Sequence, residues 1–433
     1  MTDLSFVRTD MLPEEPAPAS EVGIVGWARA NLFNGVMNSI LTIVSVLFIG
    51  FVLYEVLLWA LQSSWTATSL RECREAIVLA HGEGTHGACW AVIRERFLQL
   101  IYGFYPRELY WRVNLTFVLL LVAMAPILFN ALPRKMLWFT AIYPVLGYWL
   151  LWGGSFWFPV SIMLAFVIGF FAYRTLAQMH SVLLGLIAGV LAVLLWWIFF
   201  CGPMERLLQG IIPLGLERVK TSDFGGFSLS IIIGVSGIAA SLPIGVVLAL
   251  GRQSDLFIVK SICVGFIEFI RGVPLITLLF VASTLLNYFM PPGTTFDLVL
   301  RVVIMVTLFA SAYMAEVIRG GLAALPKGQY EAADALGLDY WKAQRLIIMP
   351  QALKISIPGI VSTFIGLFKD TTLVSVIGLL DPLGLSNAIR ADAAWNGVVW
   401  EIYAFIAALF FIFCFLMSRY SMYLERKLNT GHR

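Results

Sequence analysis

Two charged residues and three hydroxyl residues stand together in an apolar stretch near the C-terminal end of the chain. They are Lys369, Asp370, Thr371, Thr372 and Ser375. An ammonium group binds a carboxylate and a carboxylate binds an ammonium, so the lysine and the aspartate together offer the charges that a free amino acid requires. The chemistry that this segment suggests is therefore the binding of a polar, zwitterionic substrate.

The position of these charges permits a second interpretation. A charge in the middle of a membrane span costs about 2.5–3.5 kcal/mol and usually faces a bundle interior or a watery cavity. Adjacent helix residues point about 100° apart, so Lys369 and Asp370 either have separate partners or the helix opens locally. The alternative to substrate binding is an ion pair between helices, with the hydroxyl groups satisfying freed backbone groups. The sequence leaves both interpretations open.

The composition of the chain indicates a membrane protein. The chain has 433 residues, of which 60% are hydrophobic and 13% are charged, against about 25% charged residues in a soluble domain. A membrane span requires about 20 apolar residues. We expect an all-α polytopic membrane protein with about ten spans. They lie near residues 39–61, 113–132, 136–152, 156–174, 181–202, 226–250, 272–290, 298–319, 355–378 and 399–419.

The motifs divide the chain near residue 210. A cytoplasmic tail at 1–38 precedes a five-span extension at 39–205, and a five-span segment at 220–425 holds every motif discussed here. The net charge of +3 does not favour a nucleic-acid partner. The histidines show no metal-ligand spacing, so no metal site is expected, and no catalytic constellation is found.

Lysine and arginine favour the cytoplasmic side in short loops, which predicts that both termini are cytoplasmic. The loop at 62–112 is then outside the cytoplasm. Cys73 and Cys89 share this loop, and an oxidising compartment permits a disulfide between them.

A polar loop at 322–352 joins two apolar stretches and contains residues at regular spacing. Three residues separate Glu331-Ala332-Ala333 from Gly337, and nine more separate Gly337 from Ile347, with Pro350 following. We expect a helix at Gln329–Leu336, closed by the left-handed glycine. Asp339 then caps a second helix at Tyr340–Ile348, which Pro350 ends.

This pattern resembles the loop by which permease subunits of bacterial ABC importers engage their ATPases, with Met349 in place of leucine. Three further segments resemble the histidine/glutamine/glutamate group of these permeases: Ile267–Leu275, Ser311–Gly321 and Phe368–Ser375. The five-span extension resembles the long subunits of general L-amino-acid or glutamate/glutamine/aspartate/asparagine importers. The resemblance covers roughly residues 220–425 and implies a five-helix type I ABC importer permease core.

The resemblance assigns roles to residues. The ATPase-coupling residues are Glu331, Ala332, Ala333, Gly337, Leu338, Ile347 and Pro350. The substrate path contains Lys369, Asp370, Thr371, Thr372 and Ser375. Arg271, Glu316 and Arg319 are structural or interface residues, because arginine at the end of a span extends to the headgroups and Glu316 stands one turn before Arg319.

The resemblance also implies partners. They are a sister permease, two ABC ATPase subunits, a periplasmic substrate-binding protein, the lipid bilayer of the bacterial inner membrane and a polar or acidic L-amino acid. The chain has no G-x-x-x-x-G-K-[ST] sequence to bind ATP phosphates, so ATP and magnesium belong to the ATPase and this chain holds no cofactor. The alternatives are a secondary transporter, which requires no ATPase, and a membrane scaffold or enzyme.

Overall fold

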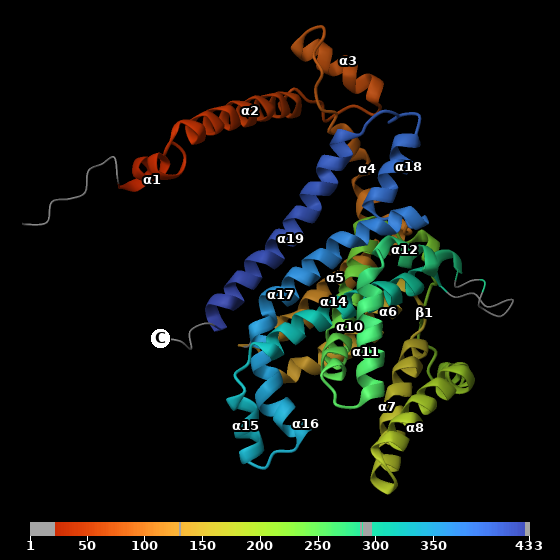
Figure 1. The fold of residues 1–433 in the computed structure, drawn as a ribbon. Helices are drawn as coiled ribbons and strands as arrows, with labels where there is room; N and C mark the ends of the chain where they lie inside the picture. Colours follow the sequence, from red (N-terminus) through yellow and green to blue (C-terminus); the bar gives the residue numbers. More distant parts are fainter. Residues whose placement is uncertain (1–21, 130, 286–287, 289–296, 429–433) are drawn as a thin grey trace, which may run out of the picture. The chain divides into compact units, whose positions relative to one another are not determined.

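The computed structural model describes residues 22–129, 131–285, 288 and 297–428 (Figure 1). It separates into two compact units, Met1–Ala91 and Val92–Arg433. We expected a boundary near residue 210, but residues 92–205 belong to the same unit as the motif-bearing segment. Residues 1–21 of the expected tail and the end of the span expected at 272–290 lie outside the described residues.

The first unit contains one long apolar helix and a small disulfide-linked hairpin. Its helices are α1 (Gly23–Asn31), α2 (Val36–Leu61) and α3 (Leu70–His81). With 26 residues, α2 is long enough to cross a bilayer. Ser69 caps α3 by accepting a hydrogen bond from the Glu72 N–H. Cys73 in α3 forms a disulfide with Cys89, which closes the hairpin.

The second unit is a bundle of helices. Its N-terminal elements are α4 (Ala91–Tyr102), η1 (Arg107–Leu109), α5 (Tyr110–Leu128), η2 (Arg134–Met136), α6 (Leu137–Trp152), β1 (Gly154–Ser155), α7 (Trp157–Met179), α8 (Val182–Leu195), η3 (Trp196–Phe200), α9 (Cys201–Ile211), β2 (Gly215–Leu216) and η4 (Thr221–Asp223). Its C-terminal elements are α10 (Gly226–Arg252), α11 (Phe257–Gly272), α12 (Leu275–Phe280), η5 (Val281–Leu285), α14 (Leu298–Ala323), α15 (Gly328–Ala335), α16 (Tyr340–Ala343), η6 (Gln344–Ile348), α17 (Met349–Asp370), η7 (Thr371–Ile377), α18 (Pro382–Ala391) and α19 (Trp400–Leu428). The two short strands pair antiparallel.

The described helices agree closely with the expected spans. Eight of them are long and apolar enough to cross a membrane, and there are nine if the bent pair α11–α12 is one span. The third expected span is α6, which has 16 residues and falls short of that length. The axis turns by 100° between α11 and α12, where Pro274 has no N–H to continue the helix. Gly272-Val273-Pro274 is thus a helix break that the sequence alone predicts.

Small residues bring α10, α14 and α17 close together. A side chain at Gly245 of α10 would lie 2.7 Å from the Cβ of Met314, and one at Gly359 of α17 would lie 2.7 Å from Val317. Gly321 of α14 is equally close to the backbone of α17 at Ala352. Apolar lipid supplies no hydrophobic force between helices, so close packing of this kind holds a membrane bundle together.

The extension contributes to the core of the second unit. Tyr105, Leu151 and Val219 are buried in one apolar cluster with Leu229 of α10 and Val302 of α14. The Tyr105 hydroxyl donates a hydrogen bond to the Leu151 carbonyl at 2.7 Å. Burial raises the pKa of Tyr105 to about 12, so this donor stays protonated at physiological pH. Residues 92–219 are thus part of the same packed body as α10 to α19.

Candidate functional site

The polar loop forms two short helices joined at a glycine, as expected. Gly337 follows α15 with φ at 68°, a left-handed conformation that favours glycine. The Asp339 carboxylate accepts a hydrogen bond from the Lys342 N–H at 3.0 Å and caps α16. Lys342 also forms an ion pair with Asp339 and holds the pKa of this carboxyl group below its ordinary value. The cap is therefore charged at neutral pH.

The expectation that Pro350 ends the second helix is wrong. The chain continues from α16 through the π-helical turn η6 into α17, and Pro350 occupies the first turn of α17. The Met349 N–H bonds to the Gln344 carbonyl, five residues earlier. This wider turn accommodates the proline ring, which clashes with the carbonyl of residue i−4 in a regular helix. Tyr340–Ile377 is consequently one run of 38 helical residues.

The π-helical turn contains a buried polar side chain that sequence reasoning missed. Gln344 is 5% exposed, and within the described residues its Oε1 atom has no hydrogen-bond partner. By contrast, Gln351, seven residues later, donates to the Gln329 side chain and to the Ile347 carbonyl. An unpaired buried amide oxygen costs about 1–3 kcal/mol, so this turn is locally strained.

The loop presents apolar side chains on its exposed surface. The exposed fractions are 73% for Leu336, 52% for Tyr340, 70% for Trp341 and 64% for Leu346. Among the coupling residues expected from the sequence, Glu331, Ala332, Gly337 and Pro350 are exposed, Leu338 and Ile347 are half-buried, and Ala333 is buried. Tyr340, Trp341 and Leu346 were missed, although their spacing on a helix is visible in the sequence. An exposed apolar group of this kind indicates a surface that contacts a protein or a membrane.

The inner side of the loop packs on the ends of the long helices. Tyr330 of α15, Ile347 and Ile348 pack in a cluster with Ile318 of α14 and Ile267 of α11. Gln329 and Gln351 bridge α15 to α17. The loop is therefore seated on the bundle and is continuous with α17.

A cluster of charges joins α10, α11 and α14 near the loop. Glu316 lies 2.7 Å from Arg252, 3.1 Å from Arg319 and 3.7 Å from Arg271. Arg252 also pairs with Glu268 at 2.9 Å. The Glu316 side chain is only 16% exposed, against 54% for Glu268. The sequence indicated the Glu316–Arg319 pair but missed Arg252, which comes from a different helix.

The charged segment expected in the substrate path lies where α17 ends. The regular helix stops at Asp370, and the chain continues in the tighter 3-10 segment η7. The hydroxyl groups of Thr371, Thr372 and Ser375 donate to the carbonyls of Phe368, Lys369 and Thr372 at 2.8, 2.9 and 2.8 Å. The local opening considered from the sequence is not seen, because Lys369 and Asp370 lie in regular helix and the chain then tightens.

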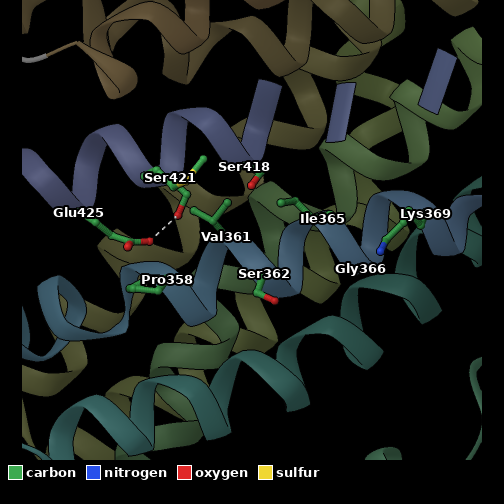
Figure 2. A pocket seen from close by; sticks show the side chains of 10 residues that line it. Pro358, Val361, Ser362, Ile365, Gly366, Lys369, Ser418, Ser421 and Glu425 are labelled. Atoms are coloured by element: carbon green, nitrogen blue, oxygen red, sulfur yellow. Dashed lines mark hydrogen bonds between the residues drawn. The ribbon is translucent and has the colours of Figure 1, made fainter. Parts of the chain in front are cut away.

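The interhelical ion pair considered as the alternative is absent from the described part of the chain. Lys369 is exposed, Asp370 is half-buried, and neither forms an ion pair with a described residue. Lys369 lies at one end of an open groove of about 440 Å³ between α17 and α19, and Glu425 lies at the other (Figure 2). The groove is lined with small and polar residues such as Ser362, Gly366 and Ser418.

The structure thus places the two expected groups of functional residues at the two ends of one helical run. The loop with Glu331 and Gly337 precedes the run, and Lys369 to Ser375 stand near its end. Figure 1 shows α15 and α16 at one end of the second unit and α18 at the other. The structure does not bring the two groups together; it connects them through α17.

The chain is similar to known permease proteins. Residues 241–430 match the family described as binding-protein-dependent transport system inner membrane component. The chain is 58% identical, over 100% of both chains, to the glutamate/glutamine/aspartate/asparagine transport system permease protein of Rhodobacter capsulatus. It is 42% identical to an inner membrane amino-acid ABC transporter permease protein of Escherichia coli, over 97% of both chains. A probable glutamine ABC transporter permease protein of Bacillus subtilis is 31% identical over 48% of this chain and 93% of its own length.

Substitution of Glu316 should destabilise the bundle more than substitution of Glu268. The change Glu316→Gln leaves Arg271 and Arg319 without this carboxylate and Arg252 with Glu268 alone. Because the arginines are partly exposed, the loss should cost about 1–3 kcal/mol. Glu268→Gln removes one exposed pair and should cost at most about 1 kcal/mol. Thermal unfolding of the two purified variants in detergent, followed by tryptophan fluorescence, compares them. Equal unfolding midpoints for the two variants would show that Glu316 does not hold these helices together.

Proposed function

This chain belongs to the permease subunits of amino-acid ABC transporters, and on that premise we propose that it imports polar or acidic L-amino acids as one half of a permease pair. The observation that carries the proposal is the helical run Tyr340–Ile377, which connects the exposed loop to the charged segment. A displacement of the loop reaches Lys369 through this run, because its backbone hydrogen bonds continue through η6. The transport cycle alternates access to the path by rigid-body movement of such elements.

The loop is the site at which an ATPase subunit binds. Its exposed apolar residues Leu336, Tyr340 and Trp341 offer contact area, and the exposed carboxylate of Glu331 can pair with a partner arginine or lysine. The phosphate-binding sequence of an ATPase does not occur in the chain, so ATP and magnesium are bound by that partner. This chain has one such loop, whereas an ABC importer uses two ATPase subunits. A sister permease therefore supplies the second loop.

The change Gly337→Asp should abolish binding of the ATPase without preventing insertion of the chain. A side chain at Gly337 meets no atom of the chain within 4 Å, so the variant carries only the strain of its left-handed backbone, about 1–2 kcal/mol. Its carboxylate, however, stands on the exposed surface of the loop and disrupts the contact. Co-purification of the ATPase with the tagged chain measures the effect.

The matched control is Gly84→Asp. Gly84 also has a positive φ, at 85°, and also has no atom within 4 Å of an added side chain. It lies in the first unit, away from the loop in sequence, and the variant should retain the ATPase. Retention of the ATPase by both variants, or its loss from both, refutes the assignment of the loop.

The substrate class follows from the charges in the path and from the relatives. Lys369 is exposed on the groove, and within the described residues it has no ion-pair partner to compete with a substrate carboxylate. Asp370 can accept the substrate ammonium. The relative from Rhodobacter capsulatus is named for glutamate, glutamine, aspartate and asparagine. A cationic path residue suits such amino acids, of which two carry a second carboxylate.

The change Lys369→Ala should weaken substrate transport without lowering the amount of chain in the membrane. Loss of a charge-assisted hydrogen bond should raise the half-saturating substrate concentration about tenfold, whereas the fold loses no ion pair. Lys354→Ala is the control, since Lys354 is an exposed lysine of the same helix near the loop. Uptake of radiolabelled L-glutamate, normalised to the chain detected in membranes, measures both. An equal loss of uptake and of the amount of chain in the membrane would favour a purely structural role for Lys369. The same comparison applies to Asp370→Ala.

The orientation proposed for the chain puts both termini in the cytoplasm of a bacterium and the hairpin of α3 on the periplasmic side. Support comes from the disulfide Cys73–Cys89, because such bonds persist in oxidising compartments. A periplasmic binding protein would then deliver substrate to the face that carries this hairpin. After Cys201, Cys263 and Cys414 are changed to serine, a membrane-impermeant maleimide should label intact spheroplasts only once the disulfide is reduced. Labelling that requires disruption of the membrane would reverse the orientation.

A further inference from the structure

Helix α4 contacts the segments that surround α18, although it lies far from them in sequence. Arg96 of α4 forms an ion pair with Asp392, which ends α18. The ring of Phe97, on the next residue, lies 6.0 Å from the ring of Phe405 in α19. The side chains of Arg96 and Asp392 are 30% and 36% exposed, so the pair is partly shielded from water. These contacts fasten the C-terminal end of α18 to the extension.

A stack of two glycines and the backbone of Leu380 holds the other end of α18. Gly103, which follows α4, has φ at 69°, and an added side chain there would lie 2.6 Å from the backbone nitrogen of Gly225. An added side chain at Gly225 would lie 2.7 Å from the Leu380 carbonyl oxygen. That carbonyl accepts a hydrogen bond from the Gly226 N–H at 2.7 Å. The backbones at residues 103, 225 and 380 are therefore in direct contact.

The segment held between these two contacts adjoins the charged path. Leu380 lies three residues after the end of η7. Asp381 caps α18 by accepting hydrogen bonds from the N–H groups of Leu383 and Gly384. Asp381 is fully buried, and burial raises the pKa of its carboxyl group to about 6. A buried cap and two flanking contacts make α18 a fixed element, and η7 is anchored to it. The position of η7 consequently depends on residues of the extension.

We propose that α4 and the stack of Gly103, Gly225 and Leu380 form an outer brace that holds η7 and α18 in the geometry required for transport. The brace rests on the proposed role of η7 in the substrate path. It lies largely outside residues 241–430, the part that matches the permease family. Arg96 is a positioning residue in this arrangement, because it acts on the path through Asp392 and does not touch substrate. The extension is thereby a working part of this permease.

The test uses the complete transporter in cells and measures the uptake of radiolabelled L-glutamate. Arg96→Ala and Asp392→Ala should each lower the maximal uptake rate about three- to fivefold, as loss of a partly exposed ion pair predicts. The half-saturating concentration and the amount of chain in the membrane should not change. The exchanged pair Arg96→Asp with Asp392→Arg should recover at least half of the uptake, and Arg96→Lys should retain most of it.

The control is Arg71→Ala, which removes the highly exposed pair of Arg71 and Glu75 in the first unit and should leave uptake unchanged. Normal uptake in Arg96→Ala, or no recovery in the exchanged pair, overturns the brace. If the single variants fail to accumulate, recovery of both chain amount and uptake rate by the exchanged pair supports it, and recovery of chain amount alone overturns it. Loss of uptake in Arg96→Ala with normal uptake in Lys369→Ala supports the brace and counts against Lys369 in the path. Normal uptake in Arg96→Ala with loss of uptake in Lys369→Ala overturns the brace and supports the proposed path.

Discussion

The continuity of the helical run Tyr340–Ile377 is the constraint on which the rest of the structure depends. A helix transmits displacement along its axis because each turn is bonded to the next, and this run connects an exposed loop to a charged segment. Both ends depart from α-helical geometry, with a π-helical turn at η6 and a 3-10 segment at η7. A change of helix type requires only a shift of hydrogen-bond register. The two ends therefore differ in hydrogen-bond register from the α-helix between them, which itself contains Pro358.

Close packing holds α17 against α14, and charges join the neighbouring helices α10, α11 and α14 to one another. Gly359 lies against Val317, and Gly321 lies against Ala352, so α14 and α17 touch nearly backbone to backbone. Near the loop, Glu316 draws arginines from three helices to one carboxylate. Packing of small residues is the main cohesive force where lipid surrounds the bundle, whereas ion pairs contribute most where water is partly excluded. The helices that surround the run are thus joined by both kinds of interaction.

The sequence predicted what depends on local patterns. Apolar length predicted most of the spans, Gly337 and Asp339 predicted the form of the loop, and Pro274 predicted the bend between α11 and α12. Two features depended on contacts between distant residues and escaped prediction. Arg252 and Glu316 are 64 positions apart in the sequence and join two helices. The unit boundary depends on the burial of Tyr105 and Leu151 beside α10. Pro350 was misread because proline usually ends a helix, and a π-helical turn that accommodates it has no sequence signature.

The location of the extension's contacts explains why such a large addition is compatible with a permease mechanism. If the loop binds an ATPase as proposed, the loop end of the second unit has to remain free, and apolar side chains of residues 336–346 are exposed there. The extension contacts the opposite end through Arg96, Gly103 and Tyr105. It also contacts α19 where the Tyr420 hydroxyl donates a hydrogen bond to the Leu128 carbonyl. A helical run that moves at the loop end does so relative to a fixed frame, and contacts at the far end supply that frame. An addition that touched α15 or α16 would compete with the partner. One that immobilises α18 instead provides a fixed position relative to which the helical run can move.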